Sequence, residues 1–176
     1  MKLLGISGSL RRESLNTALV RAAAEAFAPT RFTLADLNLP LYDGDVEARG
    51  MPEAALALNA AIRDADAIVI ATPEYNAGLS GVLKNALDWS SRVKPMPLTG
   101  KPVAILSAAA GRAGGQRAQM TLRHCLLAFD TRLVQAPQVF VHASAFEGGG
   151  LTDETTRDLV AKLMARLRAE AARCVG

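Results

Sequence analysis

Two apolar runs in the middle of the chain constrain the fold more than any other feature. Residues Ala67–Ala71 and Pro102–Ser107 show no alternation of apolar and polar side chains, whereas a strand with one face in water does alternate. Continuous runs of this kind are typical of strands buried on both faces, which occur in parallel sheets covered by helices. The sequence therefore predicts a parallel sheet between two helical layers.

Segments with helical character alternate with strand-like runs. Three more strands are expected, at Lys2–Ile6, Arg31–Leu37 and within Arg132–Val141. Helices are expected over Leu15–Phe27, Glu53–Asp64, Gly81–Val93, Gln116–Phe129 and Thr152–Cys174, the last capped by Thr152. Residues 39–52 are expected to form a long irregular loop. Five strands alternating with helices predict an α/β doubly wound sheet in one domain spanning residues 1–176.

Composition and charge narrow the classes of function. The 176 residues are half hydrophobic and carry a formal net charge of only +3, with scattered basic residues, which argues against a nucleic-acid partner. No apolar stretch reaches the roughly 18 residues of a membrane span, and no signal peptide is recognisable, so a cytoplasmic protein is expected. Cys125 and Cys174 form no metal motif with His124 and His142. Reduced thiols, structural histidines and no metal site are therefore expected.

The loop after the first strand has the composition of an anion site. Just before a predicted helix it gathers hydroxyl, amide and guanidinium groups from Ser7, Ser9, Arg11, Arg12, Ser14, Asn16 and Thr17. Backbone N–H groups at a helix N-terminus favour an anion, and Arg11 can add a charge-assisted hydrogen bond. A merely capped helix would explain one of these residues but not all. The loop lacks both the P-loop ending and the dinucleotide Gly-x-Gly-x-x-Gly pattern, so a mononucleotide phosphate fits it best.

Two more loops leave strands at the same edge of the predicted sheet, where open parallel sheets bind their ligands. Residues 72–78 contain Pro73, which fixes the backbone, and Tyr75, which could lie over a flat ring or a nicotinamide. An ordinary turn with a half-exposed tyrosine is the alternative. Residues 107–115 are small and rich in glycine, so a flat ligand could approach their backbone. A loose surface loop would have the same composition.

Three motifs together resemble the NADPH-dependent FMN reductase family, which includes chromate and quinone reductases and related azoreductases. The motifs are Gly5–Arg11 with Ser14 and Asn16, then Pro73–Asn76 with Gly81–Trp89, Ser91 and Arg92, and then Gly114–Gly115 with Arg117, Ala118 and Gln119. They follow one another from the first strand to about residue 120, which makes the combination specific. The resemblance implies a flavodoxin-like three-layer α/β/α sandwich with a five-stranded parallel sheet in the order 2-1-3-4-5.

The resemblance also implies roles for individual residues. The FMN phosphate would be held by side chains and backbone of Ser9, Leu10, Arg11, Ser14, Leu15, Asn16 and Thr17. The isoalloxazine ring would be lined by Pro73, Glu74, Tyr75, Asn76, Ser107 and Ala108. The co-substrate, NADPH or NADH, would contact Tyr75 and Arg92. The helix of Arg92 and Trp89 would lie near the subunit contact of a homodimer or homotetramer.

Four positions depart from the family pattern. Gly78 and Ser80, and likewise Ala109 and Ala110, stand where the family often has Ser and Pro. These departures remove rigidity and a hydroxyl near the flavin. They are expected to affect flavin potential and acceptor preference more than flavin binding.

The expected function is an FMN-dependent NAD(P)H oxidoreductase. Hydride would pass by a ping-pong route through the bound flavin to quinones, azo compounds, chromate or free flavin. Because the cofactor carries the chemistry, no dedicated catalytic residue is assigned, and Glu74 has no visible partner nucleophile. The alternatives are a flavodoxin-type electron carrier, against which the charge of +3 counts, and a non-catalytic flavin-binding module.

Overall fold

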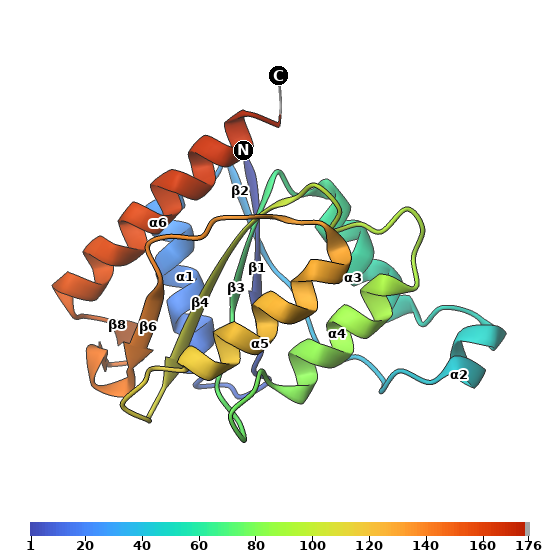
Figure 1. Ribbon diagram of the computed structural model, residues 1–176, viewed down its shortest axis with the longest axis horizontal. Helices are drawn as coiled ribbons and strands as arrows, with labels where there is room; N and C mark the ends of the chain where they lie inside the picture. The colour runs from blue at the N-terminus through green and yellow to red at the C-terminus, as the bar shows by residue number, and fades with distance from the viewer. Residues whose placement is uncertain (175–176) are drawn as a thin grey trace.

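The computed structural model describes residues 1–174 and has one parallel sheet at its centre (Figure 1). The strands are β1 (Lys2–Ser7), β2 (Arg31–Leu34), β3 (Ala67–Ala71), β4 (Pro102–Ala109) and β5 (Arg132–Leu133), in the order β2-β1-β3-β4-β5. A further strand, β6 (Val139–His142), also pairs with β4 in parallel. The predicted strand order and α/β class are confirmed.

Five main helices form the two outer layers. Helices α1 (Leu15–Phe27) and α6 (Glu154–Ala172) lie on one face of the sheet, and α3 (Glu53–Asp64), α4 (Gly81–Ser91) and α5 (Gln116–Leu126) lie on the other (Figure 1). Successive residues of a strand pack against opposite helical layers, because side chains alternate between the two faces of a strand. In β3, Val69 packs in the core with α1 and α6, whereas Ile68 and Ile70 pack in the core with α3, α4 and α5. Burial on both faces explains the unbroken apolar run of this strand.

Several local predictions differ from the structure. The strand expected over Arg31–Leu37 ends at Leu34, and the helices expected to end at Val93 and Phe129 end at Ser91 and Leu126. The fifth strand is divided into β5 and β6, and Pro137 lies in the gap, where its missing N–H cannot join the ladder. Residues 39–52 contain a short helix, α2 (Gly44–Arg49), capped by Asp43. None of its residues is buried, so it has no apolar stripe that could have predicted it. Helix α6 is capped by Asp153 rather than Thr152, with the Thr156 N–H donating to Asp153 Oδ2 over 2.7 Å.

The glycine-rich segment after β6 makes a small hairpin. Strands β7 (Phe146–Glu147) and β8 (Gly150–Leu151) pair antiparallel across Gly148 and Gly149, both with positive φ. Because Leu151 is buried in the core beside α1 and α6, the hairpin is joined to the body of the protein.

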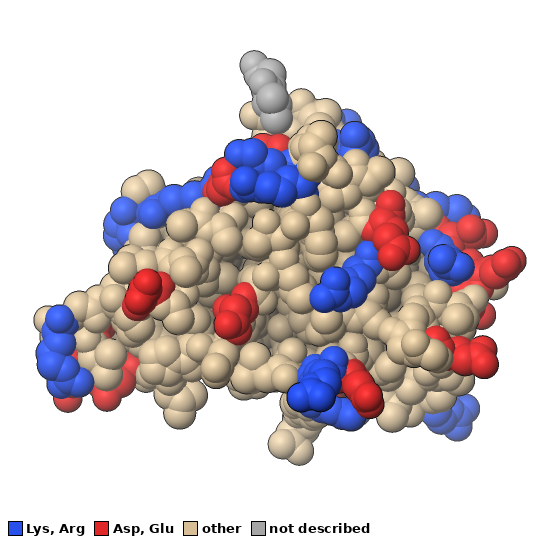
Figure 2. All heavy atoms as spheres, turned by 180° about the vertical axis from the view of Figure 1, so that it is seen from behind, with Lys and Arg blue, Asp and Glu red and all other residues tan. Residues whose placement is uncertain are grey.

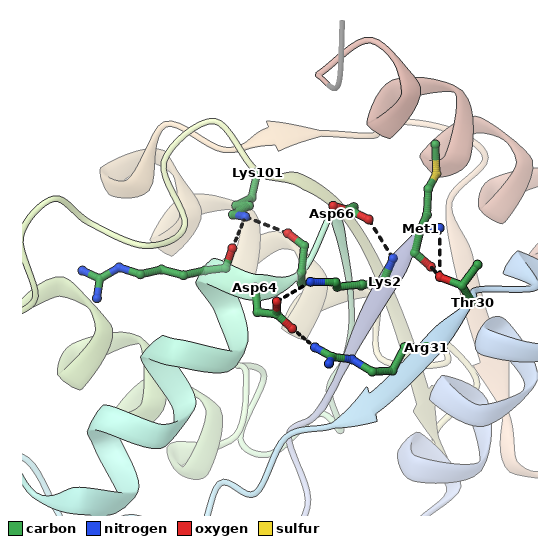
Figure 3. Close-up of polar contacts among 9 residues, drawn as sticks. Met1, Lys2, Thr30, Arg31, Asp64, Asp66 and Lys101 are labelled. Atoms are coloured by element: carbon green, nitrogen blue, oxygen red, sulfur yellow. Dashed lines mark hydrogen bonds and ion pairs between the residues drawn. The ribbon is translucent and has the colours of Figure 1, made fainter.

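Charged residues hold together the amino-terminal ends of the strands (Figure 3). Asp64, which ends α3, pairs with Lys2 of β1 and Arg31 of β2. The Lys101 ammonium donates to the carbonyl of Arg63 at the end of α3 and to that of Ala65 just after it, at 2.8 and 2.6 Å. This network lies at the end of the sheet opposite to the predicted ligand edge and leaves that edge to loops.

Charges of both signs are interspersed over the face shown in Figure 2, without a broad stripe of one sign. Within residues 1–174, no helix is both long enough and apolar enough to cross a membrane.

Candidate functional site

A cleft of about 970 Å³ opens at the carboxyl ends of β1, β3 and β4, at the upper end of the usual range for ligand pockets. The three predicted loops form its walls. From the predicted site residues the structure brings together Ser9, Arg11, Ser14, Leu15, Asn16, Pro73, Glu74, Tyr75, Asn76 and Ala108. Further lining comes from Ala77, residues 109–115 and Arg117.

The loop after β1 presents donors that the protein leaves unused. Ser14 caps α1 by accepting from the Thr17 N–H at 3.2 Å. In the described part of the chain, the backbone N–H groups of Leu10, Leu15 and Asn16 donate to no protein acceptor. The exposed Arg11 guanidinium likewise pairs with no carboxylate among residues 1–174. Free N–H groups at a helix start and an unpaired cation suit a phosphate.

Asn16 and Thr17 brace this loop against the sheet. The buried Asn16 amide donates to the Ala108 carbonyl and accepts from the Ala108 N–H, both at 2.9 Å. The Thr17 hydroxyl donates to Ser7 Oγ at 2.8 Å. These side chains are thus used inside the protein, and only the Asn16 backbone remains for a ligand. Neither Thr17 nor Leu10, which is 54% exposed, lies among the cleft-lining residues.

The loop after β3 is a tight hairpin turn. Tyr75 and Gly78 exchange two backbone hydrogen bonds of 3.1 and 3.0 Å. Between them Asn76 and Ala77 have φ of 49° and 62°, the left-handed conformation that is costly for a residue with a Cβ. Their N–H groups donate to no acceptor within the described chain. The strained turn therefore presents free donors and a half-exposed tyrosine to the cleft, as a flat polar ring requires.

Glu74 joins the second loop to α5. Its carboxylate accepts from the Arg117 N–H at 3.0 Å, the Arg117 Nε–H at 2.7 Å and the Ala118 N–H at 3.4 Å. Burial raises the pKa of Glu74, but the hydrogen bonds and charge of Arg117 outweigh it, so the pKa lies below its ordinary value. Glu74 thus caps a helix with a carboxylate whose oxygens already accept hydrogen bonds and whose lowered pKa makes it a weak base.

The loop after β4 folds back on its own strand. The buried Ser107 hydroxyl donates to the Gly114 carbonyl at 2.6 Å and accepts from Gln119 Nε2 at 2.9 Å. Gly115 has φ of 88°, and a Cβ there would lie 2.7 Å from Ser107 Cβ, so this close contact requires glycine. Ser107 lies behind the cleft wall, and Ala108 lies in it.

Arg92 lies outside the cleft lining of this chain. Arg92 directly follows α4 and donates through Nε to both Glu47 oxygens, at 3.0 and 2.8 Å. The guanidinium also sits 5.7 Å from the centre of the Tyr42 ring, which meets the buried Trp89 edge-on. Arg92 and Trp89 therefore fasten the segment around α2 to α4. The contact of Arg92 with a nucleotide stays a prediction.

Cleft residues to which the sequence assigned no individual role include Arg112 and Ala77. Arg112 lies in the glycine-rich loop, where a single arginine is no different in the sequence from one that is simply exposed to water. Ala77 contributes to the cleft through its left-handed backbone conformation, and an alanine in the sequence does not indicate such a conformation. In the part of the chain described, no group of three His, Cys, Asp or Glu residues is arranged to hold a metal.

Comparisons with known proteins agree with this geometry. Residues 1–146 match the model of the NADPH-dependent FMN reductase family. The chain belongs to this family. An NAD(P)H-dependent FMN reductase of Pseudomonas aeruginosa is 44% identical over 173 residues, covering 96% of this chain and 94% of the relative. A quinone reductase of Escherichia coli K12 is 40% identical over 143 residues, covering 78% and 76%.

A solved structure supports the same assignment. The flavoenzyme NAD(P)H:acceptor oxidoreductase FerB from Paracoccus denitrificans superimposes with a TM-score of 0.86 at 31% identity, covering 98% of this chain and 97% of that one. The family resemblance, the oxidoreductase class and FMN as cofactor, with a nicotinamide dinucleotide as reductant, are confirmed. The cleft fits FMN, because free donors of the first loop suit its phosphate and those of Asn76 and Ala77 suit its ring.

Proposed function

We propose that this protein uses FMN in the described cleft to transfer two electrons from NADPH or NADH to small acceptors, quinones first among them. The observation that carries the proposal is the presence of two sets of unused backbone donors in one cleft, those of Leu15 and Asn16 and those of Asn76 and Ala77. When bound, FMN supplies the hydride chemistry. In balance, NAD(P)H, a proton and a quinone give NAD(P)⁺ and a hydroquinone.

The chain's own residues bind and orient. Arg11 and the N–H groups at the start of α1 would hold the phosphate, and the Pro73–Asn76 loop and Ala108 would line the ring. The exposed Tyr75 and Arg112 stand at the mouth, where the reductant and then the acceptor would enter. One mouth serving both in turn supports a ping-pong order. Azo compounds, chromate and free flavin are further proposed acceptors, as the family resemblance implies.

The test is an anaerobic stopped-flow experiment on the FMN-loaded protein. Mixing with NADPH or NADH should bleach the flavin absorbance within milliseconds to seconds, and a quinone added afterwards should restore it. A protein that stays yellow with both nucleotides would exclude the reductase and favour an electron carrier or a binding module. Comparing the two nucleotides also decides the preferred reductant.

We further propose that the protein acts as a homodimer or homotetramer of single-domain subunits in the cytoplasm. Apolar side chains exposed on and just after α5, Met120 at 62% and Leu127 at 76%, support a subunit contact. Cys125 and Cys174 are both free thiols, as suits a reducing compartment. Light scattering on the FMN-loaded protein as it elutes from a size-exclusion column gives its molar mass and hence the number of subunits. The mass of a monomer would contradict the proposed assembly.

A further inference from the structure

The last residue of β6 is a histidine that is hydrogen-bonded through both ring nitrogens. His142 Nδ1 lies 3.2 Å from the Ser144 backbone nitrogen and 2.8 Å from Ser144 Oγ. His142 Nε2 lies 3.0 Å from the Ala110 carbonyl oxygen. In the sheet register His142 stands beside Ala109, the last residue of β4. The ring therefore joins the ends of two neighbouring strands.

The partners of His142 determine which nitrogen carries the proton. The Ser144 N–H can only donate, so Nδ1 must offer it a lone pair. The Ala110 carbonyl can only accept, so Nε2 must carry a hydrogen. Both requirements are met by one neutral tautomer, in which the bond at one nitrogen fixes the proton on the other. The hydrogen bond from the Ser144 N–H to Nδ1 thus keeps the proton on Nε2, where it can be donated to the Ala110 carbonyl.

Ala110 lies at the beginning of the loop that follows β4 and forms one wall of the cleft. It comes directly after the strand, and neither it nor its neighbours Ala109 and Gly111 has a side chain able to anchor the loop. The other anchor of the loop lies at its end, where the Ser107 hydroxyl donates to the Gly114 carbonyl. Residues 109–115 between and around these anchors line the cleft. Within the wall the Gly114 N–H also donates to the Gly111 carbonyl at 2.9 Å, and the two side-chain bonds described join the wall to the neighbouring strands.

We propose that His142 is a positioning residue for the FMN cleft, holding the residue 109–113 wall in its binding conformation through the Nε2–H to Ala110 bond. This rests on the proposed function only in that FMN occupies the cleft. A wall that is already ordered loses less conformational freedom when the ligand binds. Loss of the bond should therefore weaken FMN binding roughly three- to tenfold, the effect of about one ordinary hydrogen bond.

Two substitutions separate the two bonds. The glutamine of His142→Gln places its amide N–H where Nε2–H stood and can donate to Ala110, whereas the asparagine of His142→Asn places its oxygen where Nδ1 stood and can only cap Ser144. The full-length FMN-loaded proteins are diluted, and FMN release is followed by flavin fluorescence, with thermal unfolding measured alongside. We expect His142→Asn to raise the FMN dissociation constant three- to tenfold and His142→Gln to keep it near the unsubstituted value.

Equal FMN affinity in both variants, whether unchanged or weakened, would overturn the proposal. Nitrogen-15 NMR of the unsubstituted protein is a second test that needs no variant. It should report a protonated Nε2 and an unprotonated Nδ1 on His142, and the opposite tautomer would also overturn the proposal. Both readouts are independent of turnover. If NAD(P)H fails to bleach the flavin, the proposed function fails while the role of His142 is still decided by FMN affinity.

Discussion

Replacing Glu74 with glutamine tests how the second loop is joined to α5. Glutamine keeps one acceptor oxygen but loses the charge near the α5 N-terminus, worth about 0.3–1 kcal/mol. It also loses the ion pair with Arg117, whose side chain is 65% exposed, so that pair contributes at most about 1 kcal/mol. The free energy of unfolding should fall by about 0.3–2 kcal/mol, which lowers Tm by about 1–8 °C for a chain of this size.

The effect of Glu74→Gln should depend on pH. The pKa of Glu74 is lower in the folded protein than its ordinary value of 4.5, so its stabilisation is present above that value and is lost as pH falls through the folded pKa. Thermal unfolding from pH 7 to pH 3 should thus show a gap between parent and variant that closes in acid. Glu25→Gln, which removes an exposed charge on α1, is the matched control. An unchanged Tm at pH 7, or a gap that stays constant into acid, would refute the reasoning.

Three more substitutions test the cleft. Arg11→Ala should weaken FMN binding by about 1–3 kcal/mol through a lost charged hydrogen bond; unchanged affinity in a fluorescence titration would exclude Arg11 as a phosphate ligand. Tyr75→Ala should change nucleotide or acceptor kinetics in stopped flow more than FMN retention, and identical kinetics would contradict that role. Ala77→Gly should raise the free energy of unfolding by about 1 kcal/mol in denaturant titration, because glycine tolerates φ of 62°; a loss of stability would argue against strain there.

The sequence was informative wherever burial followed a simple rule. Strands β3 and β4 were predicted because parallel strands buried on both faces lose the alternation of apolar and polar residues. The edge that carries the cleft followed from topology, since ligands of such sheets bind beyond the strand ends. Helix α2 was missed because none of its residues is buried. Pro137 interrupts the last strand at a place that apolar pattern alone could not locate.

The hydrogen-bond partners of the site residues could not be predicted from the sequence, for a different reason. Asn16 is a residue type that could bind a phosphate, yet its side-chain amide is hydrogen-bonded to the backbone of Ala108, 92 positions along the chain. Glu74 reaches Arg117 across 43 positions, and neither spacing is fixed by any local rule. Arg92 was expected near the nucleotide, but its carboxylate partner Glu47 lies in α2, a helix that the sequence did not predict.

A common principle connects these partners. The cleft walls consist largely of backbone and small residues, which a flat cofactor can approach closely but which cannot anchor themselves. Their anchors are polar side chains that form hydrogen bonds within the protein: Asn16 with Ala108, Glu74 with the start of α5, and His142 with Ala110. Each links the ends of two different elements. Substitutions at these anchors should therefore change cofactor affinity through loop order, whereas substitutions at Arg11 or Tyr75 remove contacts with the ligand itself.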